Sequence, residues 1–577
     1  RKQWWFFLAV IFTEVSADRK GPPHVVFIMV DDMGWNDVSF HGSDQILTPN
    51  IDALAYQSVI LQQYYSEAIC TPARTALLTG KYPMRLGMHG RPLYNSEDRG
   101  IPLTERLLPS YMKELGYSTH LVGKWHVGMS RPEYLPTSRG FDHHYGIRGG
   151  FVDYYTYDAI ESLPNGRLLF GLDLHDDAIP QVAEERYIID ALTERAVKII
   201  HHHNSSTPLF LHVMHNAPHA GNEAGAQQPP LYSPVRNGHI ANSNRRLHAE
   251  IVTHLDRSVG KIVNALADRG IFDDTTIIFT SDNGAPTVGE FINWGVNLPF
   301  RGIKYTPWEG GVRVPAFIWQ SSVRPKVWQG LMHITDWLPT IMAATGGRGP
   351  NNIDGVNQWD SIIQGGDSNR KEVLIAIEDS NTDSWAAYRA GDYKIVVGNV
   401  TRTRNGYYGA ELMANKRNPP EYYPALRTCD VTQAFETIGV YLDLDAVKAT
   451  REAVNIKQAD TLKDVETCMP RRGCLFNLRQ DPTESHDLWG RANKIATSLM
   501  SRLSALWASQ LKRGAPRYDT NADPANFNYI WTPWLENTIV IANDTNAKTK
   551  SQSQITQIII SLLNKAIFYF TFEYVSR

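Results

Sequence analysis

Cysteine is scarce in this chain. Its 577 residues include only four cysteines, Cys70, Cys429, Cys468 and Cys474. A small scaffold held together mainly by disulfides is therefore excluded. The last three cysteines lie close together in the sequence, so one disulfide among them is expected in an oxidising compartment, and the spacing does not choose the pair. Cys70 lies far from them in the sequence.

An excess of charge of either sign is also missing. The chain has 57 lysines and arginines against 60 aspartates and glutamates, a formal net charge of −3. Proteins that bind nucleic acid or a membrane surface through a general basic field are excluded, and no nucleic-acid partner is expected. Residues 555–575 are apolar but are interrupted by four polar side chains, so no stable membrane span is expected there; these are Gln557, Asn564, Lys565 and Glu573.

The first residues have the layout of a secretory signal. Arg1 and Lys2 precede an apolar run, residues 4–12, and small residues follow at 15–17. This order is typical of a cleaved signal peptide, here residues 1–17, and the run is too short to span a bilayer. A buried N-terminal strand is the alternative interpretation. We expect the secretory pathway, with a lysosomal or secreted destination, and glycosylation sequons point the same way at Asn204, Asn399 and Asn543.

Continuous apolar runs alternate with helical patterns in the first part of the chain. The runs 24–30, 118–122, 209–213 and 276–280 suit strands buried on both faces. Between them, Thr104 can cap a helix that ends at Leu115, and an apolar stripe marks a long helix over 247–266. Strands that alternate with helices predict an α/β fold with a mostly parallel central sheet between helices.

The pattern changes after about residue 370, and the length also favours two domains. Short strands are expected at 373–377, 385–389, 393–397 and 473–478, with a helix near 490–511 and a surface loop over 405–425. The expected organisation is a larger α/β domain over 22–370, a smaller α+β domain over 371–515, and a tail of uncertain structure over 516–577.

Polar side chains follow the apolar runs. Asp31 and Asp32 come directly after the first, and Asp282 and Asn283 after the last. The carboxyl ends of parallel strands meet at one edge of a sheet, where ligands gather. Carboxylate and amide oxygens suit calcium or magnesium better than zinc. Turns and helix caps are the common alternative for such residues.

The segment Cys70-Thr-Pro-Ala-Arg74 is the most informative motif. Pro72 favours a helix start, which places the Cys70 side chain at a helix N-terminus, and Arg74 lies one turn further on, where it can reach an oxyanion. A small buried thiol is the alternative interpretation.

This segment resembles the signature of the sulfatase family, C-x-P-x-R. Other blocks resemble the family in the same order, so the resemblance is strong over residues 24–345 and weaker to about 510. The sequences of these blocks are most similar to those of the arylsulfatase B-like enzymes. The matching blocks are residues 30–35, 48–52, 116–126, 217–219, 281–284 and 301–311. Ala73, the unpaired third C-terminal cysteine and the tail after about residue 540 depart from the family pattern.

The resemblance implies an alkaline-phosphatase-like fold and a sulfuric ester hydrolase. It implies that a formylglycine-generating enzyme converts Cys70 to 3-oxoalanine (formylglycine), and that one Ca²⁺ ion is bound. The implied metal ligands are Asp31, Asp32, Cys70, Asp282 and Asn283. The implied sulfate-binding residues are Lys124, Lys304 and His219. His126 is implied to assist the formylglycine diol, Arg74 to orient it, and His219 to protonate the leaving oxygen.

The substrate expected from the resemblance is a sulfated sugar, such as a glycosaminoglycan, or a small aryl-type sulfate. A phosphoryl hydrolase of the same superfamily and a non-catalytic sulfatase-like binding protein are the alternatives. His201 to His203 are interpreted as a polar helix end and not as a metal site. Trp294, Tyr305 and Trp308 are interpreted either as pocket walls or as core residues.

Overall fold

The computed structural model describes residues 21–182, 186–222, 227–232, 236–379, 384–457, 468, 470–513 and 518–535. The signal peptide predicted at 1–17 and the sequon at Asn543 lie outside these residues. The described part of the predicted tail contains two short 3-10 helices, Thr520–Ala522 and Pro524–Phe527. The division at residue 370 stays a prediction.

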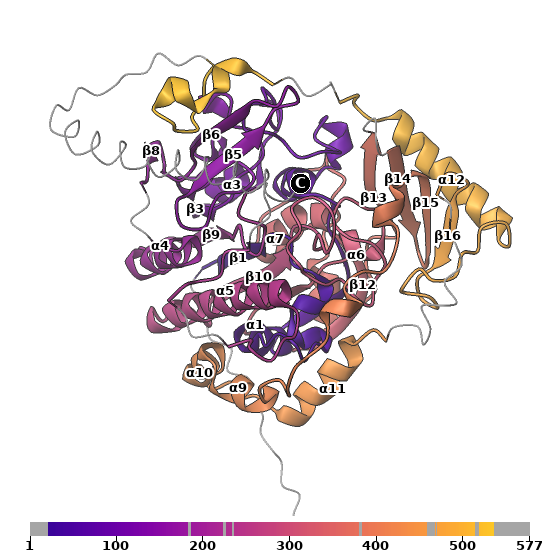
Figure 1. The fold of residues 1–577 in the computed structure, drawn as a ribbon. Coiled ribbons are helices and arrows are strands. Elements are labelled where there is room, and N and C mark those ends of the chain that lie inside the picture. The colour runs from indigo at the N-terminus through magenta and orange to yellow at the C-terminus, as the bar shows by residue number, and fades with distance from the viewer. Residues whose placement is uncertain are drawn as a thin grey trace, which may run out of the picture. The chain divides into compact units, whose positions relative to one another are not determined.

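A ten-stranded sheet forms the centre of the described structure (Figure 1). Its strands, in spatial order, are β12 (Lys326–His333), β2 (Val59–Tyr65), β11 (Ala316–Trp319), β10 (Thr275–Ser281), β1 (His24–Val30), β9 (Leu209–Met214), β3 (Ser118–Gly123), β4 (His143–Gly146), β7 (His175–Asp176) and β8 (Ile179–Pro180). β11, β7 and β8 have antiparallel neighbours, and the remaining pairs are parallel. The predicted α/β class with a mostly parallel sheet is confirmed.

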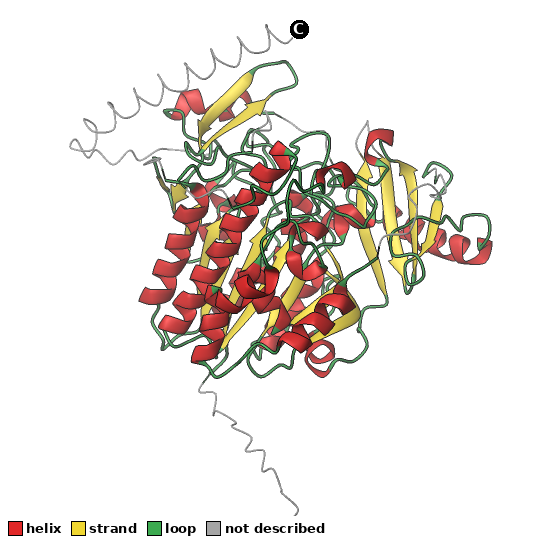
Figure 2. Ribbon diagram, turned by 60° about the horizontal axis from the view of Figure 1, so that its bottom comes forward, coloured by secondary structure: helices red, strands yellow, loops and turns green. Residues whose placement is uncertain are grey.

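Helices cover the sheet, which explains why its central strands are apolar on both faces. Val25, Phe27 and Met29 of β1 belong to a core shared with helices α2, α3, α7 and α8, while the alternate residues of β1 are equally buried. The long helices α4 and α5 pack side by side and α1 packs against α5, as Figures 1 and 2 show. The bounds are α1 (Pro49–Tyr56), α2 (Cys70–Thr79), α3 (Leu108–Glu114), α4 (Ile188–His202), α5 (Ser243–Asp268), α6 (Glu309–Val312), α7 (Trp337–Ala344) and α8 (Trp359–Gln364).

The helix predicted to begin after Thr104 starts later than expected. α3 begins at Leu108 with Pro109 in its first turn and Leu107 at the capping position, so the prediction of Thr104 as the cap is wrong. Proline fits the first turn because its missing N–H has no partner there in any case. α5 is close to its predicted range, and Gly270 follows it with a positive φ of 71°.

A smaller antiparallel sheet follows in the chain. Its strands are β13 (Glu372–Asp379), β14 (Ser384–Ala390), β15 (Tyr393–Asn399) and β16 (Cys474–Asn477), and α12 (Asn493–Ala508) packs against them. The predicted strands and final helix therefore exist. The loop predicted over 405–425 is wrong at its end, because α9 (Tyr422–Thr428) begins there. α10 (Asp430–Thr437) and α11 (Leu444–Val454) were not predicted, and β5 (Asp158–Ser162) and β6 (Leu168–Leu172) form a separate hairpin.

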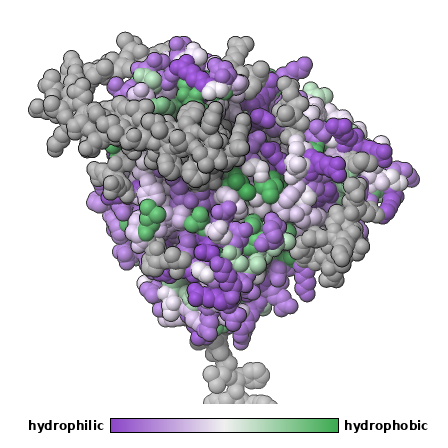
Figure 3. Space-filling model, in the orientation of Figure 1, coloured by the Kyte–Doolittle hydropathy of each residue, from purple (hydrophilic) through white to green (hydrophobic). Residues whose placement is uncertain are grey.

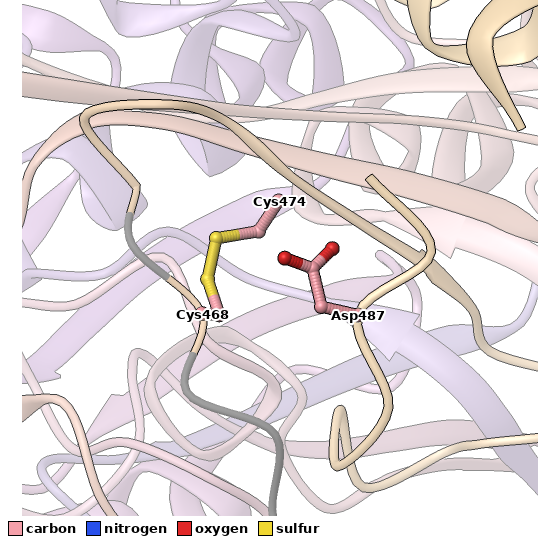
Figure 4. A group of neighbouring side chains, drawn as sticks. All are labelled: Cys468, Cys474 and Asp487. Carbon is pink, nitrogen blue, oxygen red and sulfur yellow. A yellow bond between two sulfur atoms is a disulfide. The ribbon is translucent and has the colours of Figure 1, made fainter. Parts of the chain in front are cut away.

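One disulfide joins Cys468 to Cys474, which confirms a single bridge among the three C-terminal cysteines (Figure 4). Asp487 lies beside it and accepts hydrogen bonds from the backbone N–H groups of Leu475 and Trp489, at 2.9 Å each. Because both cysteine sulfurs are in the disulfide, the group of Cys468, Cys474 and Asp487 has a structural role and is not a metal site. Cys429 is the third cysteine and is free and buried.

The described surface has no large apolar face in the view of Figure 3, where hydrophilic residues predominate and hydrophobic ones form small separate groups. The most exposed large hydrophobic residues, Leu231, Tyr441 and Ile179, come from three separate segments. Among the described residues, every helix is too short or too polar to cross a membrane.

A buried ion network joins the two sheets. Lys394 of β15 is fully buried and contacts Glu309 and Glu484, each at 2.8 Å. Glu309 also accepts a hydrogen bond from Tyr65 at the end of β2, at 2.7 Å. Glu309 begins α6, five residues after Lys304, so the small sheet helps to hold the segment that carries Lys304.

We expect Lys394→Met to lower the free energy of unfolding by about 3 kcal/mol, because it leaves the buried Glu484 without Lys394 and leaves Glu309 with the more distant Arg313, at 3.3 Å. A thermal melt of the purified variant measures this as a clear drop in melting temperature. Lys448→Met is the matched control, since Lys448 is half-exposed and its pair with Asp445 contributes less than about 1 kcal/mol. Equal melting temperatures for the two variants would show that the network does not stabilise the fold.

Candidate active site

Five parallel strands end at one edge of the large sheet, and the predicted site residues follow them. Asp31 and Asp32 follow β1, Asp282 and Asn283 follow β10, Lys124 and His126 follow β3, and His219 follows β9. Cys70 begins α2, a short distance after β2. All these side chains are buried, as are Arg74 and Lys304; the most exposed is His126, at 5%.

The acidic side chains form one crowded cluster. Ligand atoms of Asp31, Asp282 and Cys70 lie within 4.8 Å of one another, and so do those of Asp31, Asp32 and His219. Burial and the neighbouring Asp31 raise the pKa of Asp282 to about 7. Carboxylates that approach this closely repel each other unless a cation lies between them.

Two oxygens of this cluster are buried without a hydrogen-bond partner. They are Oδ1 of Asp31 and Oδ1 of Asn283. Buried polar atoms are nearly always paired, so these two indicate a ligand. Oxygen donors from carboxylates and an amide are those that Ca²⁺ prefers, and the residues present therefore fit such an ion.

Three cationic side chains pair with the aspartates of this cluster. Lys124 Nζ lies 2.5 Å from Asp31, Lys304 Nζ 2.7 Å from Asp32, and Arg74 Nη2 2.9 Å from Asp282. Burial opposes the charge on Lys304, but Asp32 together with Tyr305, Cys70 and Asp31 outweighs this effect and keeps the pKa of Lys304 well above its ordinary value. This lysine is therefore charged at neutral pH and suits an anionic ligand.

Cys70 is a poor nucleophile in its thiol form. Burial raises the pKa of the thiol, although Lys124 and Lys304 act in the opposite direction. Reactive cysteines need a lowered pKa, because the thiolate is the species that attacks. A buried, protonated thiol among cations and carboxylates therefore does not act by ordinary cysteine chemistry.

His126 is held as a neutral imidazole with one free acceptor. Its Nε2 lies 2.9 Å from the carbonyl oxygen of Leu93, which can only accept, so Nε2 carries the proton. Nδ1 is buried and has no partner. Burial and Lys124 hold the pKa of His126 well below its ordinary value. The ring can therefore accept a proton at Nδ1.

His219 lies on the other side of the acidic cluster. Its Nδ1 donates to the carbonyl oxygen of Ala220 at 2.7 Å, and its Nε2 lies 3.5 Å from Asp32. Burial and Lys304 lower its pKa to about 4. Phe151 stacks on this ring with an interplanar angle of 2°, and Phe291 also contacts it.

Some residues of the site carried no separate prediction. Thr71 donates from Oγ1 to the carbonyl oxygen of His126, at 3.0 Å, and accepts from the N–H of Leu93, at 3.1 Å. Its place inside the Cys70–Arg74 motif was the available signal. Phe151 and Phe291 lie in loops, and neither residue belongs to a motif.

The remaining predicted residues lie outside this cluster. Asn204 is exposed and Asn399 is half-buried at the end of β15. His203 is the C-terminal capping residue directly after α4 and contacts the carbonyl oxygen of Thr207, as expected for a polar helix end. Trp308 is a core residue that packs on Phe476.

Comparison with known proteins identifies the family. The sequence profile described as Sulfatase matches residues 23–347. Mouse arylsulfatase J is 33% identical over 553 residues, which cover 93% of this chain and 83% of the relative. The chain belongs to the sulfatase family. Mouse N-acetylgalactosamine-6-sulfatase is 30% identical to this sulfatase over 444 residues, which cover 71% of this chain and 83% of the relative.

Solved structures agree on the fold of this sulfatase. The crystal structure of Ps i-CgsB in complex with k-i-k-neocarrahexaose aligns with a TM-score of 0.64 at 24% identity, covering 86% of this chain and 95% of that one. The crystal structure of the PsFucS1 sulfatase from Pseudoalteromonas sp. aligns with a TM-score of 0.58 at 25% identity, covering 86% and 92%. The predicted enzyme class, a sulfatase, is confirmed.

Proposed function

We propose that this sulfatase hydrolyses sulfate monoesters of sugars or aryl alcohols, with Cys70 converted to formylglycine and one Ca²⁺ ion bound beside it. The observation that carries the proposal is the meeting of Cys70, Asp31 and Asp282 within 4.8 Å. The two oxygens left without partners, on Asp31 and Asn283, support a cation at the same place.

The proposed ligands of the ion are Asp31, Asp32, Asp282, Asn283 and the modified Cys70. A bound Ca²⁺ ion supplies positive charge that offsets the negative charge of the sulfate group. Hydrated formylglycine would supply two hydroxyl groups on one carbon: one as the nucleophile that displaces the alcohol from sulfur, the other to release sulfate by returning the carbon to the aldehyde. A formylglycine-generating enzyme is the partner that this modification requires.

The surrounding side chains suit two parts of the reaction, the attack of residue 70 on sulfur and the departure of the alcohol. Lys124 and Lys304 are placed to pair with sulfate oxygens, where preorganised charge stabilises the transition state. Nδ1 of His126 accepts a proton from a hydroxyl of residue 70, and Arg74 orients that residue. His219 is placed to donate a proton to the leaving alcohol oxygen through Nε2 when it is in the imidazolium form, which the negative charge of a bound sulfate ester favours.

Sulfated sugars are the favoured natural substrates, because a relative that shares most of this chain is named N-acetylgalactosamine-6-sulfatase. Glycosylation at Asn204 and Asn399 is consistent with their positions, one exposed and one half-buried. We place the protein in the secretory pathway, with a lysosomal or secreted destination.

Matched aryl substrates test the proposal. We expect kcat/KM for 4-nitrophenyl sulfate to exceed that for 4-nitrophenyl phosphate by about a hundredfold or more. The physical reason is the nature of the nucleophile. A geminal diol expels sulfate as it returns to the aldehyde. Phosphoryl hydrolases of this superfamily mostly use threonine or serine as the nucleophile instead. Release of 4-nitrophenol from both esters at equal enzyme concentration measures the ratio, and a preference for the phosphate would overturn the proposal.

A further inference from the structure

Two phenylalanines form a wall against His219. The ring centroid of Phe151 lies 5.9 Å from that of His219 and 5.0 Å from that of Phe291, and Phe291 lies 5.4 Å from His219. His219 is almost completely buried, whereas both phenylalanines are only half-buried. The two rings therefore continue outward from the histidine and keep part of their surface accessible.

The position of Phe151 is fixed by the reaction centre itself. A Cβ atom added to Gly150 would lie 2.7 Å from Cε1 of His126, so this loop lies directly against the second histidine. The N–H of His126 also donates to the carbonyl oxygen of Arg148, at 3.0 Å. Phe151 thus follows a segment in contact with His126 and places its own ring on His219.

Phe291 is held by a different loop. Asn293 donates from Nδ2 to the carbonyl oxygen of Asp32, at 2.9 Å, and to that of Pro218, at 3.3 Å. Phe291 has a positive φ of 51° and Trp294 one of 58°. Bulky residues rarely adopt this conformation, and such strain gathers at sites where the surrounding structure enforces it.

The charged residue that directly precedes Phe291, Glu290, is already paired. Glu290 contacts Arg404 at 3.6 Å, and the guanidinium of Arg404 lies over the ring of Tyr305, 5.0 Å from its centre. Phe151 and Phe291 themselves offer only aromatic faces. An uncharged ring matches such a surface better than an ionised group does.

We infer that Phe151 and Phe291 form the subsite for the leaving alcohol and select esters whose alcohol part is a ring with a flat apolar face. An aryl ring and the apolar face of a pyranose share this chemistry. The inference rests on the proposed function for the direction in which the ester binds, since it places the alcohol beside His219. It assigns specificity to two residues that do not take part in the chemical step.

Sulfonates that cannot be hydrolysed test the subsite without turnover. Phenylmethanesulfonate has a methylene in place of the ester oxygen of phenyl sulfate, and ethanesulfonate is the matching analogue of methyl sulfate. We expect calorimetric titration of the native protein to show about tenfold tighter binding of phenylmethanesulfonate, and this preference to disappear in Phe151→Ala and Phe291→Ala. Phe291→Leu keeps apolar bulk without the flat face and should lose most of the preference while remaining folded.

Phe170→Ala is the matched control, because Phe170 is also half-buried but stacks on Tyr529. Equal binding of both sulfonates by the native protein, or a preference that the Phe151 and Phe291 variants keep, would overturn the inference. If the native protein prefers phenylmethanesulfonate but hydrolyses no sulfate ester, the proposed function is refuted while the inferred subsite is not. The loss of kcat/KM caused by Phe291→Leu is then compared for 4-nitrophenyl sulfate and N-acetylgalactosamine 6-sulfate. The larger loss shows whether Phe291 binds an aryl ring or a pyranose.

Discussion

Cys70→Ala is expected to abolish hydrolysis of sulfate esters while leaving the fold intact. The rate should fall by a factor of about 10⁴ or more, because removal of a nucleophile leaves only binding and charge stabilisation to act. The side chain is small, so alanine at this position costs little packing energy. Release of 4-nitrophenol from its sulfate ester measures the activity, and circular dichroism checks the fold.

Cys429→Ala is the control for this variant. Cys429 is the other free, buried cysteine, and it lies between α9 and α10, where it contacts Thr432. Full activity is expected in that protein. The mass of the peptide that contains Cys70 gives a second measurement, since formylglycine is lighter than cysteine. A native protein that is active with an unmodified thiol, or more than a trace of turnover in Cys70→Ala, would contradict the assignment.

The second large effect is expected at the acidic cluster. Asp31→Asn and Asp282→Asn should each lower kcat/KM by about a hundredfold or more, because each removes a charged ligand of the proposed ion and leaves a buried cation without its partner. Calcium at a hundredfold excess over its dissociation constant should stabilise the native protein by about 2.7 kcal/mol, and both variants should lose this gain. Metal analysis after dialysis and thermal melts with and without calcium measure these effects.

Asp256→Asn is the matched control for the metal prediction. Asp256 is also a buried aspartate, but it accepts hydrogen bonds from the N–H of Ile51 and the amide of Asn50, and burial raises its pKa to about 7. Asparagine at this position should leave calcium content and turnover nearly unchanged. Calcium bound with native stoichiometry by both Asp31→Asn and Asp282→Asn would show that these residues are not its ligands.

The sequence predicts the position of residues that lie close together in the chain and of residues that directly follow predictable strands. Asp31 and Asp282 are an example, since each directly follows a continuous apolar run and parallel strands end at a common edge. The start of α2 at Cys70 follows from the proline two residues later. The predicted start of α3 is wrong, because threonine is a good capping residue and the sequence favours Thr104 as the cap. Pro109 lies in the first turn instead, so the helix begins later.

Local periodicity and strand direction are therefore enough to predict the α/β core, the motif at Cys70 and the oxygen-bearing side chains at the strand ends. Three features come from the folded arrangement: Phe151 and Phe291 meet at His219, Lys394 contacts Glu309, and Nδ1 of His126 has no partner. These contacts join loops and domains that are distant in the chain. They depend on how the loops pack over the sheet edge, and no local pattern of residues records that packing.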